Sequence, residues 1–139
     1  MTAIFSTKAD VKRYLEYFSA NDFDQASRYW SPGIKVLLGD RFRIESREEN
    51  VKFFQEQRRL INEEVVPQTI VLDDSACALR AVVNFTPLQD LPEGFARMPP
   101  IKLGQYYQLQ YLIMYHLDQS KQIDTIIGER IGEAKIFDI

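Results

Sequence analysis

The sequence is poor in the residues that build disulfides and metal centres. It has one cysteine, Cys77, and one histidine, His116. A lone cysteine excludes an internal disulfide, and a metal site would need carboxylates without imidazole or thiolate ligands. Cys77 falls in the apolar run 76–83, where we interpret it as a small buried hydrophobic residue. A glycine-rich phosphate-binding motif is also missing, so we expect neither a metal nor an organic cofactor.

Positive charge and long apolar runs are also scarce. The net charge of -3 and the pI near 5.2 argue against nucleic acid as the main partner. No stretch is long enough to span a bilayer, and residues 1–13 lack the apolar core of a secretory signal. We therefore expect a cytoplasmic protein. At 139 residues, the chain has the length of one domain, residues 1–139, with a core of its own.

Capping motifs and apolar spacing predict three helices in the first half of the chain. Thr7 and Asp10 form a capping-box pair ahead of a helix that we expect to end near Ala20. A second helix follows Asn21-Asp22 and stops at Pro32-Gly33. Ser46, with Glu49 three residues later, predicts the start of a third helix ending near Asn62.

The second half is rich in β-branched and aromatic residues and predicts long strands. These cover residues 65–72, 77–85, 106–117 and 123–137, and two short strands, 34–38 and 42–45, flank Gly39-Asp40 before the third helix. The expected architecture is an α+β domain in which the helices close one side of a strongly curved, mainly antiparallel sheet.

The stretch 105–117 carries the clearest functional pattern. With a period of two, Tyr107, Tyr111 and Tyr115 share a face with Leu109, Ile113 and Leu117. Phenols along an apolar wall are typical of a ligand cavity, although tyrosines at the edge of an ordinary core would give the same pattern. The opposite face carries Leu112, Met114 and His116, so we expect a homodimer through this face, with His116 at its surface.

The loop 87–100 holds four of the six prolines and cannot belong to the sheet. Its apolar residues, which include Phe95 and Met98, predict either a lid over a ligand or a cap over the core.

Acidic residues among isoleucines mark the last strand. Glu129 and Glu133 share a face, and a carboxyl group in an apolar cavity has a raised pKa that suits acid–base chemistry. We predict Glu133 as the acid–base residue, the alternative being that both glutamates form ordinary solvated pairs. Arg41 or Arg43, pointing inward, would balance charge.

The order of elements, with the segment FSANDFDQASRYWSPGIKV at 18–36, resembles the SnoaL-like polyketide cyclases of the NTF2-like superfamily. The spacing of Tyr111, Tyr115 and Glu133 is similar to that of the Tyr, Tyr and Glu of small fungal isomerases, the brevianamide-type semipinacolases. The histidine and aspartate pairs of the bacterial cyclases and of scytalone dehydratase are absent.

This resemblance implies an NTF2-like cone and a cofactor-independent isomerase or cyclase. Its implied reaction is a semipinacol-type 1,2-shift or ring closure of a hydrophobic, oxidised indole alkaloid supplied by an upstream oxygenase. The implied site has Glu133, Tyr115, Tyr111 and Arg41 as catalytic residues. Residues expected to contact the substrate are Tyr107, Ile113, Glu129, Phe95 and Met98. Other activities in the same superfamily are polyketide or terpenoid cyclisation, dehydration, and ligand or partner binding without catalysis.

Overall fold

The computed structural model describes residues 2–38, 43–94 and 99–139. In chain order its elements are α1 (Lys8–Ser19), α2 (Phe23–Ala26), the short 3-10 helix η1 (Ser27–Tyr29), β1 (Trp30–Leu38), β2 (Arg43–Ile44), α3 (Arg47–Gln57), β3 (Ile61–Leu72), β4 (Ala76–Pro87), β5 (Gln105–Leu117) and β6 (Ile123–Asp138).

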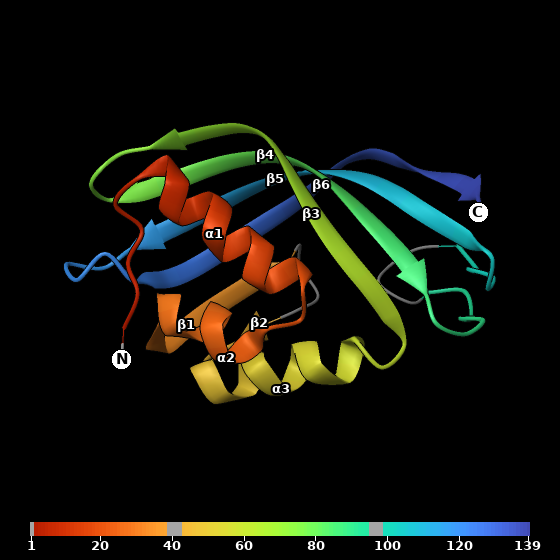
Figure 1. Cartoon of the computed structure of the whole chain (residues 1–139), viewed down its shortest axis with the longest axis horizontal. Helices are drawn as coiled ribbons and strands as arrows, with labels where there is room; N and C mark the ends of the chain where they lie inside the picture. Colours follow the sequence, from red (N-terminus) through yellow and green to blue (C-terminus); the bar gives the residue numbers. More distant parts are fainter. Residues whose placement is uncertain (1, 39–42, 95–98) are drawn as a thin grey trace.

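All six strands form one sheet in the order β2-β1-β6-β5-β4-β3. Neighbours run antiparallel except β1 and β6, which are parallel. The sheet curves, with α1 lying across its inner face and α2 and α3 beside β1 (Figure 1). The prediction of an α+β domain with helices on one side of a curved sheet is therefore confirmed.

The caps predicted from the sequence are present. Thr7 Oγ1 accepts a hydrogen bond from Asp10 N at 3.1 Å, and Asp10 Oδ2 accepts one from Thr7 N at 2.9 Å. Ser46 Oγ accepts from Glu49 N at 3.1 Å and starts α3. These bonds satisfy backbone N–H groups that have no partner inside a helix, which explains where α1 and α3 begin.

Two predicted helix ends are wrong. α3 ends at Gln57 and not near Asn62, because Ile61 already pairs with Pro87 as the first residue of β3. The second helix is also shorter than predicted, since β1 begins at Trp30 and continues through Pro32-Gly33. The pairing of β1 with β6 is irregular between Trp30 and Lys35, so the missing N–H of Pro32 breaks no ladder bond there.

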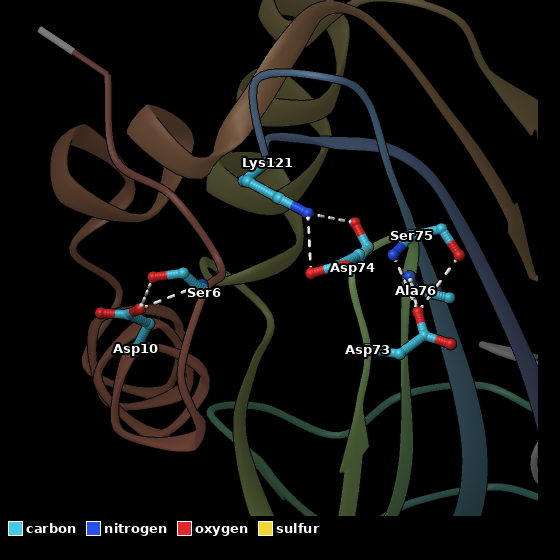
Figure 2. A network of polar contacts seen from close by, with 7 residues as sticks. All are labelled: Ser6, Asp10, Asp73, Asp74, Ser75, Ala76 and Lys121. Carbon is cyan, nitrogen blue, oxygen red and sulfur yellow. Dashed lines mark hydrogen bonds and ion pairs between the residues drawn. The ribbon is translucent and has the colours of Figure 1, made fainter.

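Two hairpin turns and the N-terminal segment meet at one end of the sheet (Figure 2). In the β3–β4 turn, Asp73 Oδ1 accepts from Ser75 N at 2.8 Å. Lys121, in the β5–β6 turn, donates from Nζ to the carbonyl oxygen of Asp74, and its own carbonyl accepts from Phe5 N at 2.9 Å. These contacts close the end of the sheet over which the N-terminus of α1 lies.

No helix within the described ranges is long and apolar enough to cross a membrane. The core fills the space between the helices and the concave face of the sheet, with Trp30, Tyr107, Phe5 and Leu109 among its fully buried side chains.

Candidate functional site

A cavity of about 500 Å³ opens on the concave face of the sheet. Apolar side chains from α1, α3 and the sheet make most of its wall, including Phe18, Phe54, Val65 and Ile113. Its polar lining residues are Tyr14, Gln57, Glu63, Tyr111, Tyr115, Glu129 and Arg130. Of these, Glu129 and Arg130 are exposed, so they mark the opening, whereas Tyr14 and Tyr115 are buried at the inner end.

Glu63 is the buried carboxylate of this cavity. It follows Ile61 and precedes Val65 on the inward face of β3, and its Oε1 lies 3.2 Å from Arg58 Nη1. The two side chains are 13% and 5% exposed, so the ion pair is screened from water. Burial raises the pKa of the Glu63 carboxyl, while the nearby Arg58 guanidinium acts in the opposite direction. The result is a carboxylate that binds a proton more readily than one in water.

Arg58 is held in place from several sides. Its Nε donates to Asn21 Oδ1 at 2.6 Å, and its guanidinium lies over the rings of three phenylalanines at 4.9 to 5.7 Å from their centroids. These rings belong to Phe18, Phe23 and Phe54. Cation–π contacts of this kind strengthen when water is excluded, so Arg58 is a fixed positive charge beside Glu63.

Two phenols lie near the same carboxylate. Tyr14 and Tyr115 pack edge to face with ring centroids 5.9 Å apart. Burial raises the pKa of Tyr115 well above its ordinary value, with smaller contributions from Tyr14, Cys77 and Glu63, and burial likewise raises the pKa of Tyr14. Both phenols therefore stay protonated at neutral pH and can act as hydrogen-bond donors.

The hydroxyl protons of these two tyrosines have no acceptor within residues 2–38, 43–94 and 99–139. The Tyr14 oxygen accepts a hydrogen bond from Trp30 Nε1 at 2.9 Å, which orients the hydroxyl and leaves its proton available. At its inner end the cavity therefore combines a carboxylate that can take a proton with phenols that can donate hydrogen bonds.

The predicted tyrosine face of β5 is present, and its members play different parts. Tyr111, Ile113 and Tyr115 line the cavity, as does Glu129 from β6. Tyr107 is fully buried and does not line the cavity. Its hydroxyl instead donates a hydrogen bond to the carbonyl oxygen of Pro100. Tyr107 thus holds the chain at Pro100, and the structure does not place it where we expected substrate contact.

Glu133 does not join the tyrosines. It is exposed and lies in a separate, smaller groove with Gln108, Gln110, Ile131 and Lys135. Ile127 pairs with Met114, and Ile131 pairs with Gln110, so the odd-numbered residues of this part of β6 belong to the outer face, and Glu129 reaches only the rim of the cavity. The expectation that the shared face of Glu129 and Glu133 points into the cavity is therefore wrong for Glu133.

Strand register explains the difference. Residues directly opposite each other in a ladder lie on the same face, and Tyr115, Ile113 and Tyr111 face Ile126, Gly128 and Arg130. The even-numbered residues of β6 therefore point with the tyrosines toward the cavity. Near Gly132, which has a φ of +72°, the pairing with β5 becomes irregular, and this bulge further changes the direction of the chain before Glu133.

The remaining candidates have the following positions. Arg41, Phe95 and Met98 lie outside the described residues, and so does the side chain of Arg43. His116 is exposed on the outer face, as predicted from its parity. Cys77 is fully buried, and burial raises the pKa of its thiol to about 11, which confirms it as an apolar core residue and not a nucleophile.

Within the described part of the chain, no three His, Cys, Asp or Glu side chains are grouped so that they could hold a metal ion.

Sequence reasoning missed Glu63, Arg58, Gln57 and Tyr14. The signal for Glu63 was present, since Ile61, Glu63 and Val65 alternate with exposed residues in the manner of one strand face. Assigning Leu60 and Ile61 to the third helix hid this alternation. Arg58 falls inside the range predicted for the third helix. Its partner Asn21 lies 37 residues earlier in the chain, and its partner Glu63 lies on a stretch of β3 that was not predicted as strand.

Comparison of the sequence finds no matching protein-family model and no matching curated protein. Many solved structures are nevertheless similar in fold. A protein from Silicibacter sp. TM1040, described as a polyketide cyclase, superposes with a TM-score of 0.73 at 21% identity, covering 87% of this chain and 85% of that one.

Two further structures extend the comparison. SalBIII, an epoxide hydrolase/cyclase-like enzyme of pyran ring formation in the polyether salinomycin, has a TM-score of 0.68 at 12% identity, with 91% and 92% coverage. An NTF2-like protein of unknown function from Cytophaga hutchinsonii has a TM-score of 0.61 at 11% identity, with 94% and 93% coverage. The fold is therefore the NTF2-like cone, as the resemblance implied.

Proposed function

We propose that the protein is a cofactor-independent cyclase or isomerase that acts on a hydrophobic, oxygenated molecule. One observation carries this proposal: the buried Glu63–Arg58 pair lies beside two phenols in a largely apolar cavity of about 500 Å³. A cavity of this size encloses a small molecule, and a carboxylate with a raised pKa takes up a proton more readily than an exposed one, as a general base must.

The structural neighbours support the same class of chemistry. Those named above include a protein described as a polyketide cyclase and an epoxide hydrolase/cyclase-like enzyme. Ring closure, epoxide opening and carbon shifts share one requirement, because a hydroxyl must lose a proton while another atom gains electron density. The cavity offers a group for each role.

We assign the roles by geometry. Glu63 takes the proton of a ligand hydroxyl, and Tyr115 and Tyr14 donate hydrogen bonds to the atom that becomes negative. The positive charge of Arg58 compensates the negative charge that Glu63 carries before it accepts the proton and after it returns it. The apolar walls of the cavity fix the conformation in which the substrate reacts, and this conformation largely decides which of the competing rearrangements occurs.

As the finer proposal, we infer that the reaction is a semipinacol-type 1,2-shift or ring closure of an oxidised indole alkaloid in the cytoplasm. In the shift, a hydroxyl loses its proton and its C–O bond becomes a carbonyl. The carbonyl forms as a carbon substituent leaves the same carbon with its bonding electrons and bonds to the adjacent imine carbon, and the imine nitrogen takes up a proton. The step is an isomerisation and needs no oxidant or reductant, although an upstream oxygenase must supply the hydroxyl. The resemblance to fungal isomerases supports this choice.

The test uses a 3-hydroxyindolenine prepared from tetrahydrocarbazole, whose rearrangement to the spiro-indoxyl is followed by chiral chromatography. We expect the protein to accelerate the reaction and to consume one enantiomer faster. Glu63→Gln should lower the rate by about 10² or more, the usual contribution of a general base. Tyr115→Phe should lower it by roughly 10², typical of one lost donor to a developing negative charge.

Glu133→Gln decides between the two carboxylates. If Glu63 is the base, this variant keeps rate and enantiomer preference, because Glu133 lies outside the cavity. Loss of activity in Glu133→Gln together with normal activity in Glu63→Gln would move the site to the outer groove. Binding of the indolenine without acceleration would instead favour the alternative of a non-catalytic ligand-binding module.

We further propose a homodimer through the outer face of the sheet. Leu112 and Met114 are exposed there at the centre of β5. The helices lie on the other face of the sheet (Figure 1). The other face of the sheet is occupied by the helices and the cavity, so a dimer formed in this way would leave the cavity opening free.

A further inference from the structure

Gln57 presents an unpaired acceptor to the cavity. It is the last residue of α3 and one of the polar residues in the cavity wall. Its Oε1 atom is buried and has no hydrogen-bond partner among the residues that the structure describes. A buried carbonyl oxygen without a donor loses its hydration and gains nothing in return, so native structures contain few of them.

Two other buried polar groups show why Gln57 differs. Within the described ranges Arg58 Nη2 also lacks a hydrogen-bond partner, but its guanidinium lies over three aromatic rings that attract its charge. Both side-chain polar atoms of Asn50 lack partners as well, yet Asn50 is fully buried in α3 and does not line the cavity. Gln57 combines an unpaired acceptor with access to the space that a ligand would fill.

We propose that Gln57 Oε1 accepts a hydrogen bond from a hydroxyl or N–H group of the ligand and thereby selects substrates that carry such a donor. The inference rests on the proposed function, since it concerns the same cavity. It narrows the substrate class to alcohols or N–H compounds whose donor reaches the end of the cavity where α3 passes into β3.

The positions of the other polar groups agree with this recognition. Glu63 lies just beyond the α3–β3 connection from Gln57, and both line the cavity. Tyr115 offers a hydroxyl proton from β5. A substrate with a donor group near Gln57 and an accepting oxygen or nitrogen near Tyr115 would satisfy both sides, whereas a purely apolar molecule would leave them unpaired.

The experiment compares three probes by isothermal titration calorimetry: naphthalen-2-ylmethanol, its methyl ether, and 2-methylnaphthalene. They share one aromatic body, and only the alcohol can donate. The folded wild-type protein should bind the alcohol about fivefold to tenfold more tightly than the ether, the range for one neutral hydrogen bond. In Gln57→Leu the two probes should bind within about twofold of each other, while 2-methylnaphthalene binds as well as before or better.

Asn50→Leu is the matched control, because it removes a second unpaired buried amide away from the cavity and should retain the preference for the alcohol. Gln57→Met serves as a second variant if Gln57→Leu does not fold. An equal affinity of the wild type for alcohol and ether, or a preference that survives in the folded Gln57 variants, would overturn the inference. Either result would leave the proposed function standing, because that function is tested by the turnover of Glu63→Gln. Failure of all three probes to bind would contradict both this inference and the proposal that the cavity binds a substrate.

Discussion

Glu63 is subject to two opposing effects whose balance decides its chemistry. Removal from water favours the protonated carboxylic acid, and Arg58 at 3.2 Å favours the carboxylate. The net direction is a raised pKa, so burial outweighs the ion pair. A carboxyl group in this state can accept a proton from a ligand hydroxyl more easily than an exposed glutamate can, and it can return that proton later in the reaction.

This balance predicts how stability depends on pH. With a folded-state pKa above the ordinary 4.5, the folded protein holds a proton that the unfolded chain has released, so its free energy of unfolding falls as pH rises from 4.5 through the raised pKa. Glu63→Gln mimics the protonated side chain and cannot titrate, so its free energy of unfolding lacks this dependence on pH. The wild type should therefore lose stability relative to the variant over that interval, as measured by urea denaturation at several pH values. A difference that instead grows in favour of the wild type with rising pH would mean that Arg58 prevails and the pKa is lowered.

Among the elements, β6 determines which side chains reach the cavity. Its ladder with β5 places Ile126, Gly128 and Arg130 on the cavity side. The irregular stretch at Gly132 then interrupts the alternation. Gly132 adopts a φ of +72°, a conformation that side chains with a Cβ atom disfavour, although space around its Cα is open.

Replacing this glycine tests how far the bulge depends on it. Gly132→Ala should lower the free energy of unfolding by about 1–2 kcal/mol, because a Cβ is strained in the left-handed region. Gly33→Ala in β1 is the matched control, since no atom lies within 4 Å of the added Cβ and its φ is not in that region. This control should be neutral or stabilise by about 0.4–1 kcal/mol through the unfolded state. Equal thermal denaturation midpoints for both variants would show that the bulge tolerates an ordinary residue.

The same elements show how far the sequence alone could be followed. Capping pairs such as Thr7 with Asp10 act over three residues, so the beginnings of α1 and α3 were predictable. The face shared by Tyr111 and Tyr115 was also predictable, because alternation is a property of one strand. Strand-to-strand register is set by distant residues, so the phase of β6, and with it the position of Glu133, could not be read from the sequence. Glu63 was missed for a related reason, since the start of β3 depends on pairing with Pro87.

At the scale of the whole molecule, the curved sheet separates two functions. Its concave face encloses the cavity together with α1 and α3, and one end is closed by the contacts between Lys121, Asp74 and Phe5. Its convex face carries apolar side chains, with Leu112 53% exposed and Met114 36% exposed. Such side chains are ordinary when scattered, but here they lie on one strand with Ile127 and Ile131 of β6 beside them.

Association through the convex face makes a prediction about oligomeric state. A two-fold interface would bring this patch against its own copy and bury roughly 800 Å² on each protomer, the size of a standard stable interface. Sedimentation velocity at micromolar concentration should show a dimer. Leu112→Glu should convert it to a monomer, because like charges would then face each other without water across the two-fold axis. Leu103→Glu changes a leucine that is 63% exposed but precedes β5 and lies outside the sheet, so it should leave the dimer intact. A wild type that sediments only as a monomer, or a dimer that survives Leu112→Glu but not Leu103→Glu, would place any association elsewhere.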